Sequence, residues 1–458
     1  PNTLVLNLLE ANGDDVPVVA ARARSLLPAG YRKITGYECK QKGYEWFGAD
    51  PGHEALTAYG LLQFADMAKV HDVDAAMVDR TRAWLMARRD GKGNFLHGAA
   101  GHHSWGGGQP TTNAYVTYAL LQSGTPAADL KVELDALVAR AATEDAYELA
   151  LIACALHLAK RPEATTARAH LRDRQEADGS LRGTTSITNS GGNDLAVEAT
   201  GFAILAWLPD PAFAGAVRRA IEFVQHSRSG SGTFGATQAT IAALRALTAY
   251  ATANRATRTP GTVRVFAGDR QLAERAFTAN ENGVLTFELW SQLAAGEHEL
   301  RVEVEGGGTP LAWTCEVAYH AEQPADDPTA PLAVATTLRA ATAAEGGTVA
   351  LDVVVRNTTA TAVPTPIAIV GLPAGCELPT RVLEDLQRSD AFAFWELRGR
   401  ELVLYWRELA AGAEQTLTLD LVARVPGTST GPAARAYPYY SPTQKRWAAP
   451  LALTVTAQ

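Results

Sequence analysis

Apolar residues in the first half of the chain recur at intervals of three and four, up to about Asn254. This spacing places apolar side chains on one face of an α-helix. One segment with this pattern contains Leu56, Tyr59, Leu62, Phe64 and Met67. Since the same region is rich in alanine and leucine, we expect the first half to be entirely helical.

The pattern changes beyond Pro260, where apolar residues stand at every second position. Alternation of this kind is typical of β-strands with one buried face. Segments 255–261 and 322–328 are polar, contain proline, and have the composition of linkers. We therefore expect three parts, 1–255, 256–324 and 325–458, of which the last two are built of strands.

The helical part repeats a unit of two helices. In each copy a helix ends in a polar turn with glycine and an aromatic or apolar residue, and a helix rich in Thr, Ala and Leu follows. The turns end segments 84–95, 171–181 and 223–234, and the Thr-rich helices are expected at 53–64, 111–121, 196–208 and 236–247. Such outer and inner pairs predict an alpha-alpha toroid of roughly eleven helices with the Thr-rich helices inside. The expected fold is multidomain α + β: this toroid, then two antiparallel β-sandwich domains.

Charge and composition exclude several kinds of partner. The formal net charge of -8 provides no cationic field for nucleic acid, so no nucleic acid is expected. No segment approaches the roughly 20 continuous apolar residues that span a bilayer, so no membrane span is expected in this chain. The cysteines are too sparse for a disulfide framework and fit no zinc motif; they are Cys39, Cys154, Cys315 and Cys376.

Several motifs occur in a fixed order along the chain. They are segments 197–208 (VEATGFAILAWL), 232–240 (GTFGATQAT), 243–247 (ALRAL), 397–406 (LRGRELVLYW) and 431–440 (GPAARAYPYY). The first three resemble the thioester domain of the alpha-macroglobulin family, and the last two resemble its terminal receptor-binding-type domain. Residues 1–9 are similar to the helix that follows the family's thioester. Residues 262–320 stand where the family has the second half of a CUB domain, so the resemblance runs along the whole chain.

The resemblance implies a C-terminal fragment of an alpha-macroglobulin-like broad-spectrum endopeptidase inhibitor, which is not an enzyme and uses no cofactor. In this family a thioester between a Cys and a Gln opens to acylate a target. No Cys-x-Glu-Gln motif occurs in the 458 residues, so both residues are expected just before Pro1. The implied partners are proteases and the remaining N-terminal macroglobulin domains of the parent. The implied location is extracytoplasmic, whether secreted, periplasmic or at the cell surface.

The resemblance also implies site residues. Some members attack the thioester with a histidine, and counting from the turn at Phe95 gives this role to His103, with His102 as the weaker alternative. The alternative is that both histidines are ordinary polar residues on the surface of a loop. Tyr439 and Tyr440 match aromatic residues that shield the thioester from water, although they are compatible with ordinary strand tyrosines. His97 adds a third nearby histidine, but a closed zinc site needs a fourth ligand, so no metal is expected.

Two other functions remain open from the sequence. Helical toroids also form enzymes of the cyclase and transferase type, and the strand-rich parts are compatible with a non-covalent binding or adhesion module related to thioester proteins. The enzyme is disfavoured because the helical part contains neither an Asp-rich diphosphate motif nor a His/Cys/Asp zinc set. A Cys-x-Glu-Gln motif before Pro1 in the parent gene would favour the inhibitor over the binding module.

Overall fold

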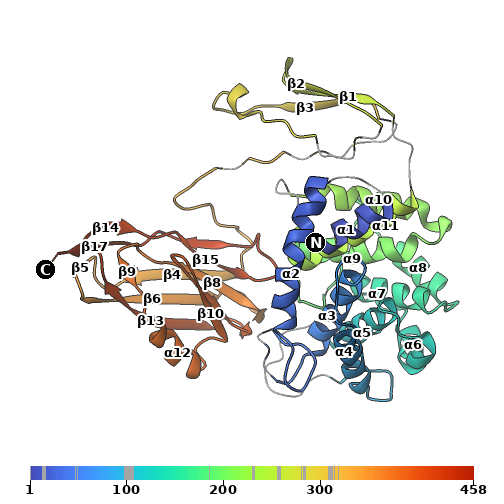
Figure 1. The fold of residues 1–458 in the computed structure, drawn as a ribbon, viewed down its shortest axis with the longest axis horizontal. Helices are drawn as coiled ribbons and strands as arrows, with labels where there is room; N and C mark the ends of the chain where they lie inside the picture. Colours follow the sequence, from blue (N-terminus) through green and yellow to red (C-terminus); the bar gives the residue numbers. More distant parts are fainter. Residues whose placement is uncertain are drawn as a thin grey trace.

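The computed structural model describes residues 2–12, 17–46, 48, 50–96, 108–184, 186–229, 233–254, 259–279, 281, 285–307, 313, 315–317 and 319–457. Figure 1 shows a group of helices, a small sheet, and a larger group of sheets. The small sheet stands apart, whereas the larger group of sheets lies against the helices (Figure 1). The expected mixture of helix and sheet is confirmed.

Eleven α-helices lie within the described residues of 2–254. They are α1 (Asn2–Asn12), α2 (Pro17–Thr35), α3 (Glu54–Met67), α4 (Ala75–Ala87), α5 (Gln109–Gln122), α6 (Lys131–Ala139), α7 (Ala146–Leu158), α8 (Ala164–Arg172), α9 (Gly192–Trp207), α10 (Ala214–His226) and α11 (Thr237–Ala253), with short 3-10 helices η1 (Ala127–Leu130) and η2 (Pro211–Phe213). The odd-numbered helices contact one another in cyclic order, and α11 returns to α1. The even-numbered helices pack around this inner ring.

Inner and outer helices differ in how many faces are buried. The inner helix α7 is buried continuously from Ala146 to Leu156, whereas the outer helix α10 buries a single face of small and aliphatic residues. A helix that is apolar all round must be surrounded by other elements, so the alanine-rich helices take the centre. Small residues also allow close approach: a Cβ on Gly201 of α9 would lie 2.9 Å from the Ala242 carbonyl oxygen on α11.

One recurring hydrogen bond anchors the repeated turns to the inner ring. In each copy the backbone N–H of the aromatic or apolar turn residue donates to a Thr or Asn side chain on the following inner helix. The pairs are Tyr44 with Thr57 (2.8 Å), Phe95 with Asn113 (3.0 Å), Leu181 with Thr200 (2.9 Å) and Phe234 with Thr240 (3.1 Å). Because a buried N–H needs an acceptor, this bond explains why a Thr or Asn recurs on the inner helix after each turn.

The small sheet contains three antiparallel strands in the order β2-β1-β3. Their bounds are β1 (Gly261–Ala267), β2 (Arg270–Phe277) and β3 (Leu300–Gly306), and η3 (Trp290–Gln292) precedes β3. Val263 and Val265 on the central strand are buried. We expected a sandwich in this part, but its described residues form one sheet, with β2 and β3 at the edges.

The C-terminal part contains two main sheets that share one apolar interior. Its elements are β4 (Leu332–Leu338), β5 (Thr342–Ala344), β6 (Thr348–Asn357), β7 (Val363–Pro364), β8 (Pro366–Gly371), β9 (Cys376–Glu377), α12 (Thr380–Arg388), β10 (Phe394–Arg398), β11 (Glu401–Tyr405), β12 (Glu408–Leu409), β13 (Glu414–Ala423), β14 (Gly427–Thr430), β15 (Ala434–Pro438), β16 (Arg446–Ala448) and β17 (Ala452–Thr456). One main sheet has the order β10-β11-β8-β15-β16 and the other β4-β6-β13-β9. Leu351 and Val353 of one sheet belong to the same buried cluster as Leu402 and Leu404 of the other.

A buried asparagine ties loops of the C-terminal part together. The side-chain amide of Asn357 donates to the backbone carbonyls of Thr361 (2.7 Å), Leu409 (3.0 Å) and Ala410 (2.9 Å). Asn357 also begins an Asn-Thr-Thr sequon, but its side chain is fully buried. The folded chain therefore cannot present this nitrogen for glycosylation.

Candidate functional site

Aromatic rings join the C-terminal part to the helical part. Trp46, in the loop between α2 and α3, lies 5.3 Å from Tyr439, 6.2 Å from Tyr440 and 6.5 Å from Tyr405, measured between ring centroids. Tyr439 meets Tyr440 edge-on at 5.0 Å. Edge-on and tilted packing at these separations is attractive beyond the area it buries. The two predicted shield tyrosines therefore lie together, against the helical part.

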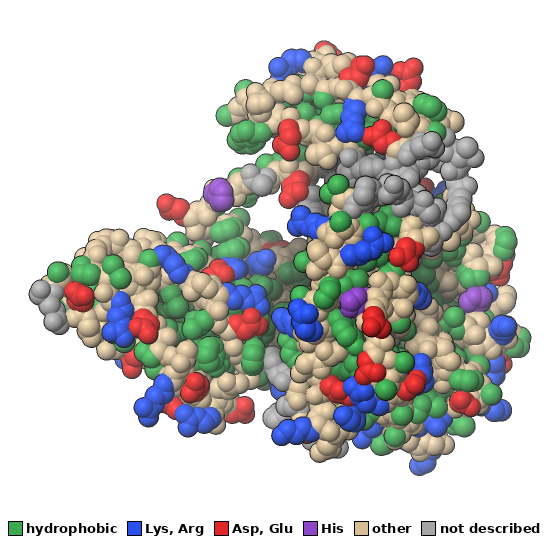
Figure 2. All heavy atoms as spheres, in the orientation of Figure 1, with side chains coloured by type: hydrophobic (Ala, Val, Ile, Leu, Met, Phe, Trp, Pro, Cys, Tyr) green, Lys and Arg blue, Asp and Glu red, His purple; other side chains and the backbone are tan. Residues whose placement is uncertain are grey.

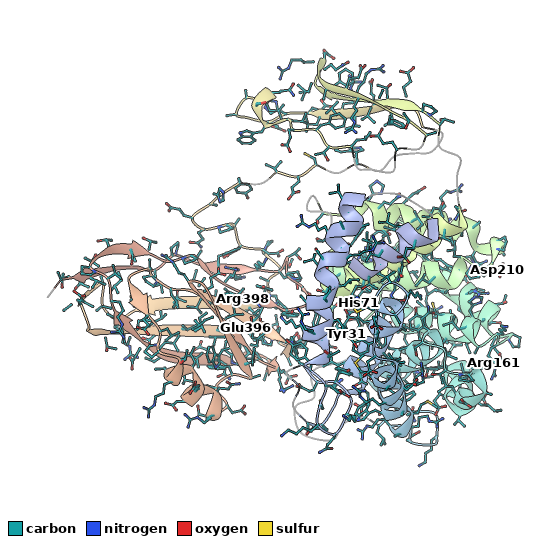
Figure 3. All side chains as sticks on the ribbon, viewed as in Figure 1. Tyr31, His71, Arg161, Asp210, Glu396 and Arg398 are labelled. Carbon is teal, nitrogen blue, oxygen red and sulfur yellow. The ribbon has the colours of Figure 1, made fainter. Side chains whose placement is uncertain are left out.

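Polar contacts hold this aromatic cluster in place. Arg407 Nη1 donates to Glu45 Oε1 at 2.8 Å, and the Glu45 side chain is only 9% exposed. On the sheet side, the Tyr405 hydroxyl donates to Glu396 Oε1 (3.1 Å) and accepts from Arg398 Nη2 (3.3 Å). Figure 3 shows Glu396 and Arg398 on the side of the sheets that faces the helices. An ion pair and an oriented tyrosine thus flank Trp46.

A small cavity lies beneath Tyr440. Its volume is about 40 Å³, which is enough for a few water molecules. The lining combines residues of α3, α11, the loop before α9 and the C-terminal part: Ala55, Leu56, Tyr59, Ile187, Thr188, Gln238 and Tyr440. Burial raises the pKa of the Tyr440 phenol, so this group is neutral at physiological pH. Tyr440 thus reaches the wall of a cavity that is otherwise made by the helical part.

The start of α1 lies close to this cavity. Gln63 Nε2 on α3 donates to Thr3 Oγ1 at 3.2 Å, and Asn7 Nδ2 donates to the Asp66 carbonyl at 3.3 Å. The two helices therefore run in the same direction, with Thr3 one helical turn beyond Tyr59, which lines the cavity. Chain that precedes α1 would approach the end of the ring where the cavity lies.

A row of hydroxyl groups leads from the cavity to a buried carboxyl group. Thr188 Oγ1 lies 3.0 Å from Ser190 Oγ, and Ser190 Oγ donates to Glu198 Oε1 at 2.6 Å. Burial raises the pKa of Glu198 to about 8, against the opposing effect of the Ser190 hydrogen bond. Glu198 is not among the site residues predicted from the sequence, although a charged residue inside the apolar run 197–208 is a visible signal.

A second buried carboxyl group lies one turn earlier on α9. Burial raises the pKa of Asp194 to about 6. Its Oδ2 has no hydrogen-bond partner among the described residues. Gly235 has a φ of +96°, and a Cβ at this position would lie 1.8 Å from Asp194 Oδ1. Glycine is therefore required here for both backbone conformation and space.

The histidine predictions cannot be placed. His97, His102 and His103 lie outside the described residues. Among the residues that the structure does describe, no group of three or more His, Cys, Asp or Glu could hold a metal ion. Nor does the described part contain a helix both long and apolar enough to cross a membrane. On the face shown in Figure 2, basic and acidic side chains are interspersed.

The family model for the A-macroglobulin TED domain matches residues 1–250. Since this is more than half of the chain, the protein belongs to the alpha-macroglobulin family, as the motifs predicted. Ovostatin of Gallus gallus is 26% identical over 336 residues, or 67% of this chain and 22% of its own length. Thioester-containing protein 1 allele S3 of Anopheles gambiae is 25% identical over 260 residues, 55% of this chain and 19% of its own. The chain thus spans about a fifth of these relatives.

Solved structures agree on the fold. Salmonella alpha-2-macroglobulin reacted with methylamine matches 99% of this chain and 30% of its own, at TM-score 0.66 and 17% identity. Native Escherichia coli alpha-2-macroglobulin from domain MG7 to the C-terminus matches 98% of this chain and 70% of its own, at TM-score 0.63 and 15% identity. At these identities the likeness concerns the fold.

Proposed function

We propose that this chain is the thioester-domain and C-terminal portion of an alpha-macroglobulin-type endopeptidase inhibitor. The observation that carries the proposal is the cavity beneath Tyr440, which the C-terminal part helps to close beside the start of α1. In this proposal residues 1–255 form the alpha-alpha toroid, 256–324 a CUB-like segment, and 325–458 a receptor-binding-type β-sandwich.

The reactive Cys and Gln would precede Pro1 and lie near this cavity. A thioester survives only where water is excluded, and Tyr439 and Tyr440 supply aromatic cover that Trp46 supports from the helical side. Withdrawal of the C-terminal part would uncover the bond and let a target nucleophile attack. The parent would act outside the cytoplasm as a protease trap, together with its N-terminal macroglobulin domains. It would be neither an enzyme nor a cofactor-dependent protein.

Two substitutions at Tyr440 in the full-length protein test the shield. Tyr440→Ala should speed spontaneous thiol release about tenfold or more, because it opens the cavity to water, whereas Tyr440→Phe keeps the ring and should remain close to the native rate. Thiol release is followed with a chromogenic disulfide. Equal rates in the native and Tyr440→Ala proteins, or no thiol in the native protein, would overturn the proposal.

His103 is proposed as the residue that attacks the thioester. An imidazole can act as nucleophile or base near neutral pH. His103→Asn should then shift acylation from hydroxyl-bearing to amine-bearing targets, whereas His102→Asn serves as the matched control and should not. The products are compared with labelled glycerol and labelled methylamine. An unchanged target preference in His103→Asn would mean that neither histidine takes part in acyl transfer.

The purified 458-residue chain should not slow a protease. Trapping needs a bait region and an enclosing cage, and both belong to the N-terminal macroglobulin domains of the proposed parent. The assay compares cleavage of a large protein substrate with and without the chain. Measurable slowing would contradict the trap mechanism and favour direct binding.

A further inference from the structure

The hydroxyl row forms a continuous hydrogen-bonded path. It begins at Thr188, which lines the cavity beneath Tyr440, passes through Ser190, and ends at the Glu198 carboxyl group. Ser186 Oγ supports the path from behind, since it accepts from the backbone N–H groups of Thr188 (3.2 Å) and Ser190 (2.7 Å). The two path hydroxyls are thus held in place by the backbone of one short loop.

The direction of the path is set at its inner end. Ser190 donates to Glu198, so its oxygen is free to accept from Thr188, and Thr188 in turn can accept from a group in the cavity. Three donations in one direction form a chain along which each hydroxyl passes on one proton and receives another. When Glu198 is ionised, this polarity would carry a proton from the cavity to the buried carboxylate.

Several titratable groups face Glu198 from the elements packed around it. They are Asp194 on α9, Tyr59 on α3, Tyr115 on α5, Tyr147 on α7 and Tyr440 of the C-terminal part. Burial raises the pKa of all four phenols, so of these five groups Asp194 is the one that carries a negative charge beside Glu198 near neutral pH. This repulsion reinforces burial in making Glu198 a stronger base than an exposed carboxylate.

We propose that Thr188, Ser190 and Glu198 form a proton relay that removes a proton from the nucleophile during acyl transfer in the cavity. The inference rests on the proposed function, because the acyl donor is the thioester expected before Pro1. Thr188 would be the catalytic residue that contacts the nucleophile, and Ser190 and Glu198 act through it.

The step balances in atoms and charge. For an amine that attacks the thioester directly rather than through His103, the bond from the amine nitrogen to the thioester carbonyl carbon forms, the carbon–sulfur bond breaks, and sulfur leaves with the electron pair as thiolate. The proton of the nucleophile goes to Thr188, the Thr188 proton to Ser190, and the Ser190 proton to the Glu198 carboxylate. One negative charge is thereby moved from Glu198 to sulfur, and no further reactant is needed.

The first experiment uses the present chain and requires no thioester. Carbon-13 NMR of glutamate-labelled protein follows each side-chain carboxyl group with pH. One resonance should titrate near pH 8 and be missing from Glu198→Gln. If every glutamate titrates near its ordinary value of about 4.3, Glu198 is no neutral-range base and the relay is overturned.

The second experiment uses the full-length protein with methylamine as the probe. The rate of thiol release, divided by the concentration of unprotonated amine, should rise with pH through about 8 in the native protein. Glu198→Gln and Thr188→Val should remove this rise. Above about pH 8 they should lower the rate of thiol release roughly a hundredfold, a contribution typical of general base catalysis. Thr188→Ser keeps the hydroxyl and should restore the native profile.

The outcomes separate the relay from the proposed function. Native thiol release with an unchanged profile in Thr188→Val overturns the relay alone. A native protein that releases no thiol overturns the proposed function and, with it, the role of the relay in acyl transfer, whatever Glu198 does in the NMR titration. If Glu198→Gln fails to fold, the Val and Ser variants of Thr188 decide the question.

Discussion

The axis of the helical ring and the interior between the two C-terminal sheets are both buried, yet their chemistry differs. The sheets enclose aliphatic and aromatic side chains, and among the described residues of this part the buried polar ones are Asn357, Thr365 and Ser441. The ring buries many polar residues, among them Thr57, Asn113, Thr117, Thr200, Gln238 and Glu198. Most of these serve the fold: Thr200 accepts a turn N–H, and Thr117 donates to the carbonyl of Asn113.

The difference follows from where the backbone hydrogen bonds lie. In a sheet the ladder satisfies the backbone, so the interior can be apolar throughout. In a ring of helices the loops that reach the centre need acceptors from side chains. A polar axis is therefore normal for this architecture. A buried polar group indicates a functional site only where no backbone group requires it as a hydrogen-bond partner. Glu198 is such a group, since no backbone N–H of a turn donates to it in the hydrogen bonds of the described residues.

The largest expected effect is a pH dependence of the ring. The pKa of Glu198 is raised from 4.5 unfolded to about 8 folded, so the folded state holds a proton that the unfolded state has lost. Its stabilising contribution is complete below pH 4.5 and is lost as pH rises through about 8. At about 1.4 kcal/mol per pKa unit, the loss approaches 5 kcal/mol. Hydrogen exchange of α9 measures it, and Glu198→Gln should flatten the profile.

The C-terminal sheets should show the opposite pH dependence of stability, and the exposed face of α10 provides a control. Arg339 lowers the pKa of Asp352 below 3.8, so this contribution is present above that value and is lost as pH falls. Amides of β6 should therefore lose protection only below about pH 3.8, whereas those of α9 gain it as pH falls from about 8 to 4.5 and stay level below that. Glu222→Gln on the exposed face of α10 should change neither profile. A native α9 whose protection does not fall between pH 5 and 8 would contradict the raised pKa.

The second prediction concerns Asn357, the most deeply buried polar residue described in the C-terminal part. Asn357→Ala removes the two amide N–H groups that contact the loop carbonyls of Thr361, Leu409 and Ala410, and should lower the free energy of unfolding by about 3 kcal/mol. Urea unfolding measures the change. The adjacent exposed Thr358→Ala removes a single bond to the Pro331 carbonyl and should cost about 0.5 kcal/mol. Equal effects would show that burial of Asn357 contributes nothing.

Part of this architecture is predictable from the sequence because its causes are local. The Thr-rich segment expected at 196–208 overlaps α9, and the repeated turns were visible before their anchoring bond to the inner ring was known. The contact of Trp46 with Tyr439 was not predictable from spacing, since it joins positions almost 400 residues apart. The path from Thr188 to Glu198 was missed because hydroxyl residues in a loop usually indicate turn chemistry.

The third prediction tests the anchoring bond. Thr200→Val preserves shape but leaves the buried Leu181 N–H without its acceptor, which should cost roughly 1–3 kcal/mol of stability. Thr200→Ser keeps the oxygen and should lose only the effect of one methyl group, about 1 kcal/mol. Thermal unfolding compares the two. If the serine variant is the less stable, packing rather than the hydrogen bond explains the recurrent threonine.

The smallest expected effect lies at the junction of the two regions, where Arg407 pairs with Glu45. Arg407 is 30% exposed, so solvent screens the pair, and a double-mutant cycle with Arg407→Gln and Glu45→Gln should give a coupling of about 1 kcal/mol. The coupling should weaken at high salt. The Arg424–Glu377 pair, which lies within the C-terminal part, is the control for effects on the sheets alone. A coupling of zero would show that this ion pair does not stabilise the junction, which would then depend on the ring contacts of Trp46 with Tyr439 and Tyr440.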